Sequence, residues 1–253
     1  MRRHAVRVSF DSNAWEAIFA FENTAHKPIQ IALREGRIQG FICAAGFRIE
    51  AITKQSRPSY FAQPHMAVTT DAPIIAKDGV FLVSMSMGPD NSKHPGLPAI
   101  QAERLGRALA AGIKLMHGEN WMGLPIPAEI GDHDLYFIED GEETRKRESE
   151  QLAVSSAIDA RGIGKAAFDA VDGWTDRPRT REEEKELIRA CAEWADGELV
   201  AAHIAYQNNI LCTNDRARSA GRSIFDTANR AWLTVSYSVV CLTLNELAAR
   251  LSS

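Results

Sequence analysis

The sequence predicts a three-layer α/β/α domain built on a mostly parallel central sheet of about four or five strands. Short runs of apolar and β-branched residues alternate with longer amphipathic segments near both ends of the chain. This alternation is typical of parallel strands joined by covering helices. The chain has 253 residues, of which 45% are hydrophobic, which is enough for one large domain or two small ones. We interpret residues 1–253 as a single domain.

The first strand and helix are expected at the start of the chain. Residues 5–10, AVRVSF, alternate apolar and polar side chains, which indicates a strand. Residues 11–23, DSNAWEAIFAFEN, then begin a helix with Ser12 or Asn13 as a natural cap. The strand therefore ends directly before an acid, Asp11.

A second strand follows within the same unit. Residues 28–38, PIQIALREGRI, read as a helix with Pro28 at its start and Gly36 just past its end. Residues 38–43, IQGFIC, indicate a strand that leads into a helix over residues 44–55. The order strand, helices, strand, helix favours a parallel sheet with helices over it.

The middle of the chain has a different character. Residues 57–98 are rich in Pro and Gly, with strand-like runs at 65–70 and 79–86 around a turn at 77–79. These features predict an inserted hairpin. Residues 99–118 then form a clear helical pattern.

The insertion is expected to continue with further helices. Residues 120–140 are irregular, and residues 143–171 are helical in pattern despite Gly162 and Gly164. We therefore expect core segments at about 4–56 and 180–251, with an insertion at about 57–179 between them.

The last third begins with a long helix. Thr180 and Glu183 have the spacing of a capping box, and the helical pattern runs from there to residue 209, interrupted only by Gly197. A strand, ILCTND, follows at 210–215. The remaining elements are a helix at 223–235, a short strand at 239–243 and a final helix at 244–251.

Composition excludes several classes of protein. No run approaches the roughly 20 apolar residues of a membrane span, and the first residues are too polar for a signal peptide. We expect a cytoplasmic protein that does not enter a membrane. The four cysteines are scattered singly, which indicates reduced, buried thiols and no zinc site. A net charge of −4 argues against a broadly basic nucleic-acid surface but is compatible with a local basic patch.

Two acids follow strands directly. Asp11 follows the first strand and Asp215 ends the strand at 210–215. The carboxyl ends of parallel strands form one edge of a sheet, where ligands bind, so these two side chains are expected to converge.

The long helix supplies a third acid. At about 100° per residue, Glu198 lies in the middle of the apolar stripe and is expected to point inward. Asp196 falls on the opposite face beside Arg189 and Glu193, where a solvated acid is ordinary. A kink at Gly197 would bring Asp196 round instead, so both remain candidates.

A fourth acid, Glu50, lies near the start of the helix after the second strand. With Asp11 and Asp215 it would complete a cluster of hard oxygen ligands, which suits Mg²⁺ or Mn²⁺. Such a cluster neutralises a scissile phosphate and orients a water, as metal-assisted phosphodiester hydrolysis requires.

Four short motifs follow one another along the chain, and their order carries information about the family. They are VSFDSNAW, IQGFICAAGFRIEAI, GELVAAHIAYQNNILCTNDRA and the closing VVCLTLNELAARL. Together they resemble the PIN-domain family of metal-dependent nucleases. In that family a first-strand Asp, a helix Glu, a later helix Asp and an Asp in a T-x-D strand end surround one or two Mg²⁺ or Mn²⁺ ions and cleave RNA.

The resemblance implies an endoribonuclease. It assigns catalytic and metal-binding roles to the acids Asp11, Glu50, Asp215 and either Glu198 or Asp196. It assigns supporting roles to Ser12, Asn13, Thr213 and Asn214. The implied partners are single-stranded or structured RNA, an antitoxin-type protein and a second copy of the chain. The segment 57–179 is longer than a small toxin-type member needs, and we expect it to help select substrate shape.

Each candidate also has a structural interpretation. Asp215 could be a turn residue and Asp11 a helix cap. Glu50 could be an exposed acid on a helix. Asp226 is expected on a helix surface and His203 in the core. The run at 142–150, with its cations Arg145, Lys146 and Arg147, reads as a solvated face.

Two other functions compete with the nuclease. One is a catalytically weak PIN-like module that binds nucleic acid or serves as a scaffold. The other is a hydrolase of small phosphate esters, although DSNAW lacks the second aspartate two positions on that an aspartyl-phosphatase pattern would have.

Overall fold

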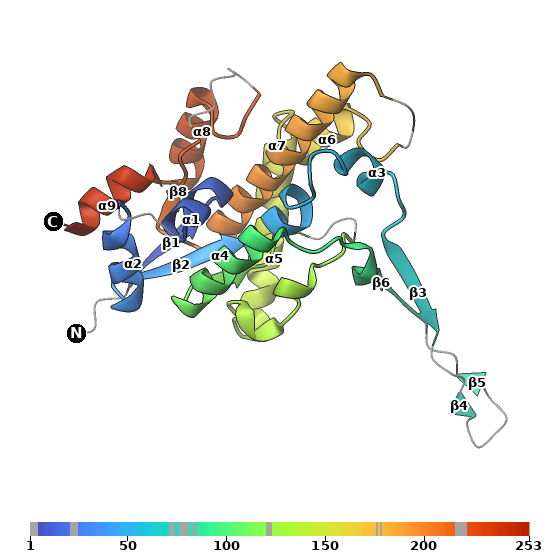
Figure 1. The fold of residues 1–253 in the computed structure, drawn as a ribbon, viewed down its shortest axis with the longest axis horizontal. Coiled ribbons are helices and arrows are strands. Elements are labelled where there is room, and N and C mark those ends of the chain that lie inside the picture. Colours follow the sequence, from blue (N-terminus) through green and yellow to red (C-terminus); the bar gives the residue numbers. More distant parts are fainter. Residues whose placement is uncertain are drawn as a thin grey trace.

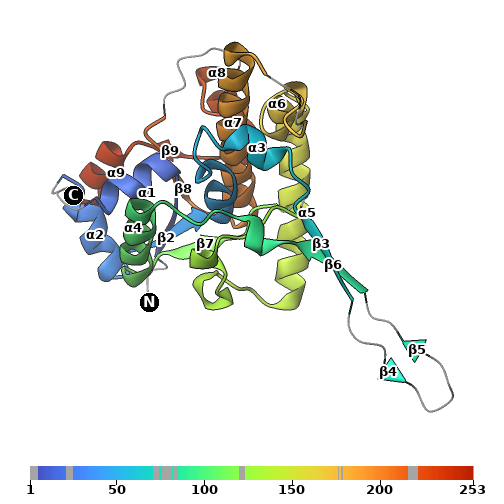
Figure 2. The same ribbon diagram turned by 45° about the vertical axis from the view of Figure 1, so that its right-hand side comes forward.

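A computed structural model describes residues 5–20, 25–70, 74–75, 81–82, 85–119, 123–175, 177, 179–215 and 222–252. Its centre is a five-stranded sheet in the order β7-β2-β1-β8-β9 in which every pairing is parallel (Figures 1 and 2). The strands are β1 (Val6–Phe10), β2 (Ile38–Cys43), β7 (Lys114–Met116), β8 (Ile210–Cys212) and β9 (Cys241–Leu242).

Helices cover both faces of this sheet, which confirms the predicted three-layer α/β/α class. One face is covered by α1 (Ser12–Ile18), α2 (Lys27–Arg34), α4 (Ala99–Ala110) and α9 (Leu244–Ser252). The other is covered by the π-helical turn η1 (Gly46–Glu50), α3 (Arg57–Phe61), α5 (Gly141–Asp159), α6 (Lys165–Ala170), α7 (Arg181–Ala205) and α8 (Thr227–Tyr237). Single 3₁₀ turns are η2 (Asn91–Lys93), η3 (Ala128–Ile130) and η4 (His133–Leu135).

The alternation predicted for the first strand divides its side chains between the two faces. Val8 and Phe10 belong to the cluster under α1, α2, α4 and α9. Ser9 points to the other face, where its Oγ lies 2.9 Å from His203 Nδ1 and accepts a hydrogen bond from Asn208. His203 is therefore the buried core histidine that the sequence predicts.

The helix predicted over 99–118 is wrong in its second half. The helix α4 ends at Ala110, the chain turns at Gly112 with φ +88°, and β7 then pairs with β2. Glycine permits this left-handed conformation, which a side chain disfavours. The expected insertion at 57–179 thus contains a strand of the central sheet, so only part of it lies outside the three layers.

The predicted hairpin forms a projecting arm (Figures 1 and 2). Strand β3 (Met66–Thr70) pairs antiparallel with β6 (Met85–Pro89), and β4 (Ile74–Ile75) with β5 (Phe81–Leu82). The second strand therefore differs from the expected 79–86, and the expected turn at 77–79 lies outside the described residues. Four apolar side chains share one exposed face of the β3–β6 ribbon: Met66, Val68, Met85 and Met87.

The helix predicted over 143–171 is two helices. Gly162 and Gly164 both have positive φ values, 74° and 66°, and separate α5 from α6. On α5, Arg147 is buried and forms an ion pair with Glu139 at 3.1 Å, while its guanidinium lies 4.4 Å from the centre of the Tyr206 ring. Arg147 therefore does not belong to the solvated face expected at 142–150.

The capping box at the start of α7 is confirmed. Glu183 N donates to Thr180 Oγ1 at 3.3 Å, and Thr180 N donates to Glu183 Oε2 at 2.7 Å. The helix then continues unbroken through Gly197. A Cβ at Gly197 would lie 2.9 Å from Gly164 Cα, so this glycine permits a close approach of α7 to the start of α6.

Among the described residues, none of the helices combines the length and apolar character needed to cross a membrane. Cys43, Cys191, Cys212 and Cys241 are all unpaired thiols.

Candidate metal site

The strand order reverses between β1 and β8. The chain leaves β1 for β2 on one side, whereas β8 lies on the other side of β1. In open α/β sheets such a reversal opens a crevice at the carboxyl ends of the strands, where ligands bind. Asp11 follows β1 there, and its backbone N donates to Cys212 O at the end of β8 at 3.0 Å.

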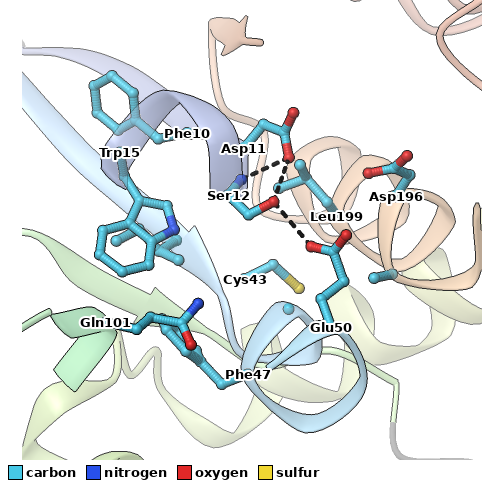
Figure 3. A pocket seen from close by; sticks show the side chains of 13 residues that line it. Phe10, Asp11, Ser12, Trp15, Cys43, Phe47, Glu50, Gln101, Asp196 and Leu199 are labelled. Carbon is cyan, nitrogen blue, oxygen red and sulfur yellow. Dashed lines mark hydrogen bonds between the residues drawn. The ribbon is translucent and has the colours of Figure 1, made fainter. Parts of the chain in front are cut away.

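The Asp11 carboxylate is held in place by its neighbours (Figure 3). It caps α1: Ser12 N donates to Oδ1 at 2.6 Å. Its Oδ2 accepts from Asn13 Nδ2 at 2.7 Å and from Thr213 Oγ1 at 2.6 Å. The structural and functional interpretations of Asp11 are therefore compatible, because the residue that caps α1 also lines the pocket at the strand ends.

Glu50 ends η1 beside Asp11. Ser12 Oγ lies 2.8 Å from Glu50 Oε2 and 3.2 Å from Asp11 Oδ1 (Figure 3). One hydroxyl carries one proton, so it donates to only one of these carboxyl groups at a time. Arg57 Nη2 donates to the Glu50 backbone O at 2.8 Å, which fixes the end of η1.

Asp196 of α7 completes the same pocket. It lines this pocket with Asp11 and Glu50, and Figure 3 shows its carboxylate projecting from α7 toward theirs. The residue is only 9% exposed. No hydrogen bond formed among the described residues reaches its carboxylate. Phe10, Trp15, Ile42, Phe47 and Leu199 form the apolar wall of the pocket.

Glu198 is buried, as the sequence predicts, but it lies on the side of α7 away from this pocket. The solvated position expected for Asp196 is wrong, because Asp196 is the acid of α7 that lines the pocket. Glu198 Oε2 accepts from Glu119 N at 2.5 Å, and the side chain lines a separate pocket with Trp194 and Asp159. The second half of α7 is buried between η1 and the helices α5 and α6. Because both faces of this half of α7 are covered, the position of an acid in the apolar stripe does not tell which face lies toward the site.

Asp215 and its neighbours join the site from β8. Asp215 N donates to Thr213 Oγ1 at 3.0 Å, and Arg230 donates to the Asp215 backbone O. Asn214 N donates to Asn13 Oδ1 at 3.1 Å. Thr213, Asn13 and Asn214 therefore connect the two strand ends.

Several acidic groups lie close enough together in the site to raise one another's pKa values. Burial, with smaller contributions from neighbouring carboxylates, raises the pKa of Asp11, raises that of Glu50 to about 7, and raises that of Asp196 well above its ordinary value. The acids that raise the pKa of Asp196 are Asp11, Glu50, Glu193 and Asp215. Within the described part of the chain, no ion pair reaches Asp11, Glu50 or Asp196. A cation would relieve this repulsion.

The donor set fits a hard divalent cation in its chemistry. All the candidate ligands are oxygens, and the nearby Cys43 thiol stays neutral because burial raises its pKa to about 12. As they stand, no three acid, histidine or cysteine side chains of the described residues are arranged to hold a metal ion. Ser12 Oγ lies between Asp11 and Glu50, so coordination of one ion by both requires side-chain rotation.

Two buried acids were assigned to the surface by the sequence pattern. Glu193 is one helical turn before Asp196 and shares its face, and that spacing was the available signal. Its Oε2 accepts from Ile224 N at 3.2 Å. Asp226 was expected on a helix surface, but it is the buried N-cap of α8 and accepts from Asn229 N at 2.8 Å.

Comparison with known proteins adds no relative. No family model, no curated protein and no solved structure matches the chain.

Proposed function

We propose that the protein is a Mg²⁺- or Mn²⁺-dependent nuclease, an endoribonuclease by its resemblance to the PIN-domain family. One observation carries the proposal. The carboxylates of Asp11, Glu50 and Asp196 line one pocket at the strand-order reversal, near the charge of Asp215. Asp11 and Asp196 are buried and Glu50 is half-buried, and no ion pair among the described residues reaches these three. Desolvated acids that lack a cationic partner are costly, and a bound cation is the compensation that also supplies chemistry.

The metal, when bound, would polarise a phosphoryl oxygen and lower the pKa of a coordinated water. The residues of the chain have separate tasks. Asp11, Glu50, Asp196 and Asp215 would hold the ion. The hydrogen bonds from Ser12, Asn13 and Thr213 keep the Asp11 carboxylate in one orientation. Because Asp11 is held in this way, the side-chain rotation that coordination of the ion requires would fall on Ser12 and Glu50.

The lining of the pocket favours a phosphodiester over a small phosphate monoester. Among the residues that the structure describes, its lining includes no Lys, Arg or His. A monoester dianion needs cationic side chains or a further metal to bind, whereas a diester carries a single negative charge and is held along the rest of the strand. A hydrolase of small phosphate esters is therefore the weaker alternative.

The decisive experiment compares two buried acids of one helix. Asp196→Asn removes a charge from the proposed site, and Glu198→Gln removes one from the far side of α7. Both variants and the wild type are assayed on single-stranded RNA and DNA with Mn²⁺, Mg²⁺ or EDTA. We expect metal-dependent RNA cleavage that Asp196→Asn lowers by about 100-fold or more and that Glu198→Gln leaves unchanged.

Other outcomes assign the protein differently. If both variants lose cleavage equally, the catalytic site is not specifically the pocket of Asp11, Glu50 and Asp196. No cleavage by the wild type, together with no gain in thermal stability from Mn²⁺, would favour the binding or scaffold module. Turnover of a generic aryl phosphate but not of RNA would favour the phosphate-ester hydrolase.

A further inference from the structure

We propose that Glu193 is a positioning residue that fixes Asp215 at the carboxyl end of β8 by holding the turn before α8. The inference rests on the proposed function only in placing Asp215 at a metal site. It adds a residue that the sequence pattern assigned to the solvated face of α7.

The first link joins α7 to the turn at 223–226. Glu193 is 8% exposed, and its Oε2 accepts from the buried backbone N of Ile224 at 3.2 Å. The hydroxyl of Ser223 also donates to this carboxylate. A buried amide without an acceptor costs about 1–3 kcal/mol, so this contact constrains where the turn lies.

The second link joins the turn to Asp215 through Arg230. Arg230 Nε donates to Phe225 O at 2.7 Å, and its Nη2 donates to the Asp215 backbone O. The same guanidinium lies 5.7 Å from the centre of the Phe225 ring. One planar cation therefore bridges Phe225, the residue next to Ile224, and Asp215, three residues past the end of β8.

The turn and the start of α8 form one rigid unit. Asp226 caps the helix by accepting from Asn229 N, and Arg230 N donates to Asp226 O at 2.9 Å. Asn229 Nδ2 in turn donates to Ser223 O at 2.8 Å. Movement of the turn away from α7 would therefore carry Arg230 with it and release the backbone of Asp215.

Glu193 acts through acceptor atoms and not by coordination. Its carboxylate is engaged by a backbone amide and a hydroxyl, and it does not line the pocket of Asp11, Glu50 and Asp196. A glutamine oxygen accepts the same hydrogen bonds without the charge. A positioning role thus predicts that Glu193→Gln is tolerated and that Glu193→Ala is not.

The experiment measures metal binding without RNA. Mn²⁺ affinity is determined by calorimetry for the wild type, E193Q, E193A, R230Q and the double variant E193A/R230Q, after thermal melts show that each is folded. We expect E193A and R230Q each to weaken Mn²⁺ binding by about 10-fold, and E193Q to keep the wild-type affinity. Because both residues act along one chain of contacts, the double variant should be no weaker than either single variant.

A second readout separates this inference from the nuclease proposal. Hydrogen exchange of the metal-free protein follows residues 213–215 and 223–225, and E193A should speed exchange in both segments while E193Q should not. If the wild type binds no Mn²⁺, the nuclease proposal fails and exchange alone decides the role of Glu193. Unchanged exchange in E193A, additive losses in the double variant, or an E193Q as weak as E193A would each overturn the positioning role.

Discussion

Replacement of Glu198 by Gln is expected to stabilise the protein at neutral and alkaline pH. Glu198 is 4% exposed, and burial, reinforced by the charges of Glu119 and Asp159, raises its pKa to about 8 from an ordinary value of 4.5. Gln has nearly the same shape, and its amide oxygen accepts the hydrogen bond that Glu119 N now donates. The substitution thus removes ionisation and keeps the contact.

The magnitude follows from the raised pKa. A carboxyl whose pKa is higher in the folded state binds its proton more tightly there, so its contribution to stability is complete below pH 4.5 and is lost as pH rises to about 8. Each pH unit in this window costs about 1.4 kcal/mol. At pH 7 the free energy of unfolding of the wild type is therefore lowered by about 3 kcal/mol, and Glu198→Gln does not suffer this loss.

Urea denaturation of the wild type and Glu198→Gln at pH 4.5, 7 and 9 measures this difference. We expect nearly equal free energies of unfolding at pH 4.5 and a growing advantage for the variant at pH 7 and 9. A variant that is equally or less stable than the wild type at pH 9 would show that the Glu198 carboxylate is charged and compensated in the folded state, which would refute the reasoning.

Three further outcomes test the fold and the site. Gly40→Ala should cost about 1–3 kcal/mol in urea denaturation, because a Cβ there would lie 2.9 Å from both Ile113 Cγ1 and Leu33 Cδ2; unchanged stability would contradict the packing of α2 and the segment before β7 on β2. Thr180→Ala should cost about 1 kcal/mol by removing the cap of α7, with Thr180→Ser as a control that keeps the hydroxyl. Mn²⁺ should raise the melting temperature more at pH 8 than at pH 6, because the Glu50 pKa of about 7 makes protons compete with the ion at the lower pH; an equal rise at both values would argue against Glu50 as a ligand.

The sequence pattern predicts those parts of the molecule whose cause is local. The strand before Asp11 and the cap of α7 both depend on residues within a few positions of each other, and both are confirmed. The strand β7 is missed because three residues after Gly112 carry too little periodicity to distinguish a strand from the end of a helix.

The sequence predicts the positions of the acids that follow strand ends, but it misplaces the acids whose position depends on how helices pack. Asp11 and Asp215 converge because β1 and β8 are adjacent parallel strands, whose carboxyl ends lie at one edge of the sheet. The choice between Asp196 and Glu198 depends on which elements cover each side of α7, and helical periodicity does not reveal which elements these are. Glu193 was assigned to the surface for the same reason, since its partner Ile224 is 31 positions away.

The arm has a consequence for the chemistry of methionine. Met85 and Met87 are 69% and 72% exposed on the β3–β6 ribbon, whereas Met116 in β7 is fully buried. Peroxide oxidises accessible thioethers to sulfoxides and turns an apolar surface polar. Mild oxidation will therefore modify the arm before the core, and the rate of sulfoxide formation at Met85 and Met87 reports directly on whether this face is covered in a given preparation.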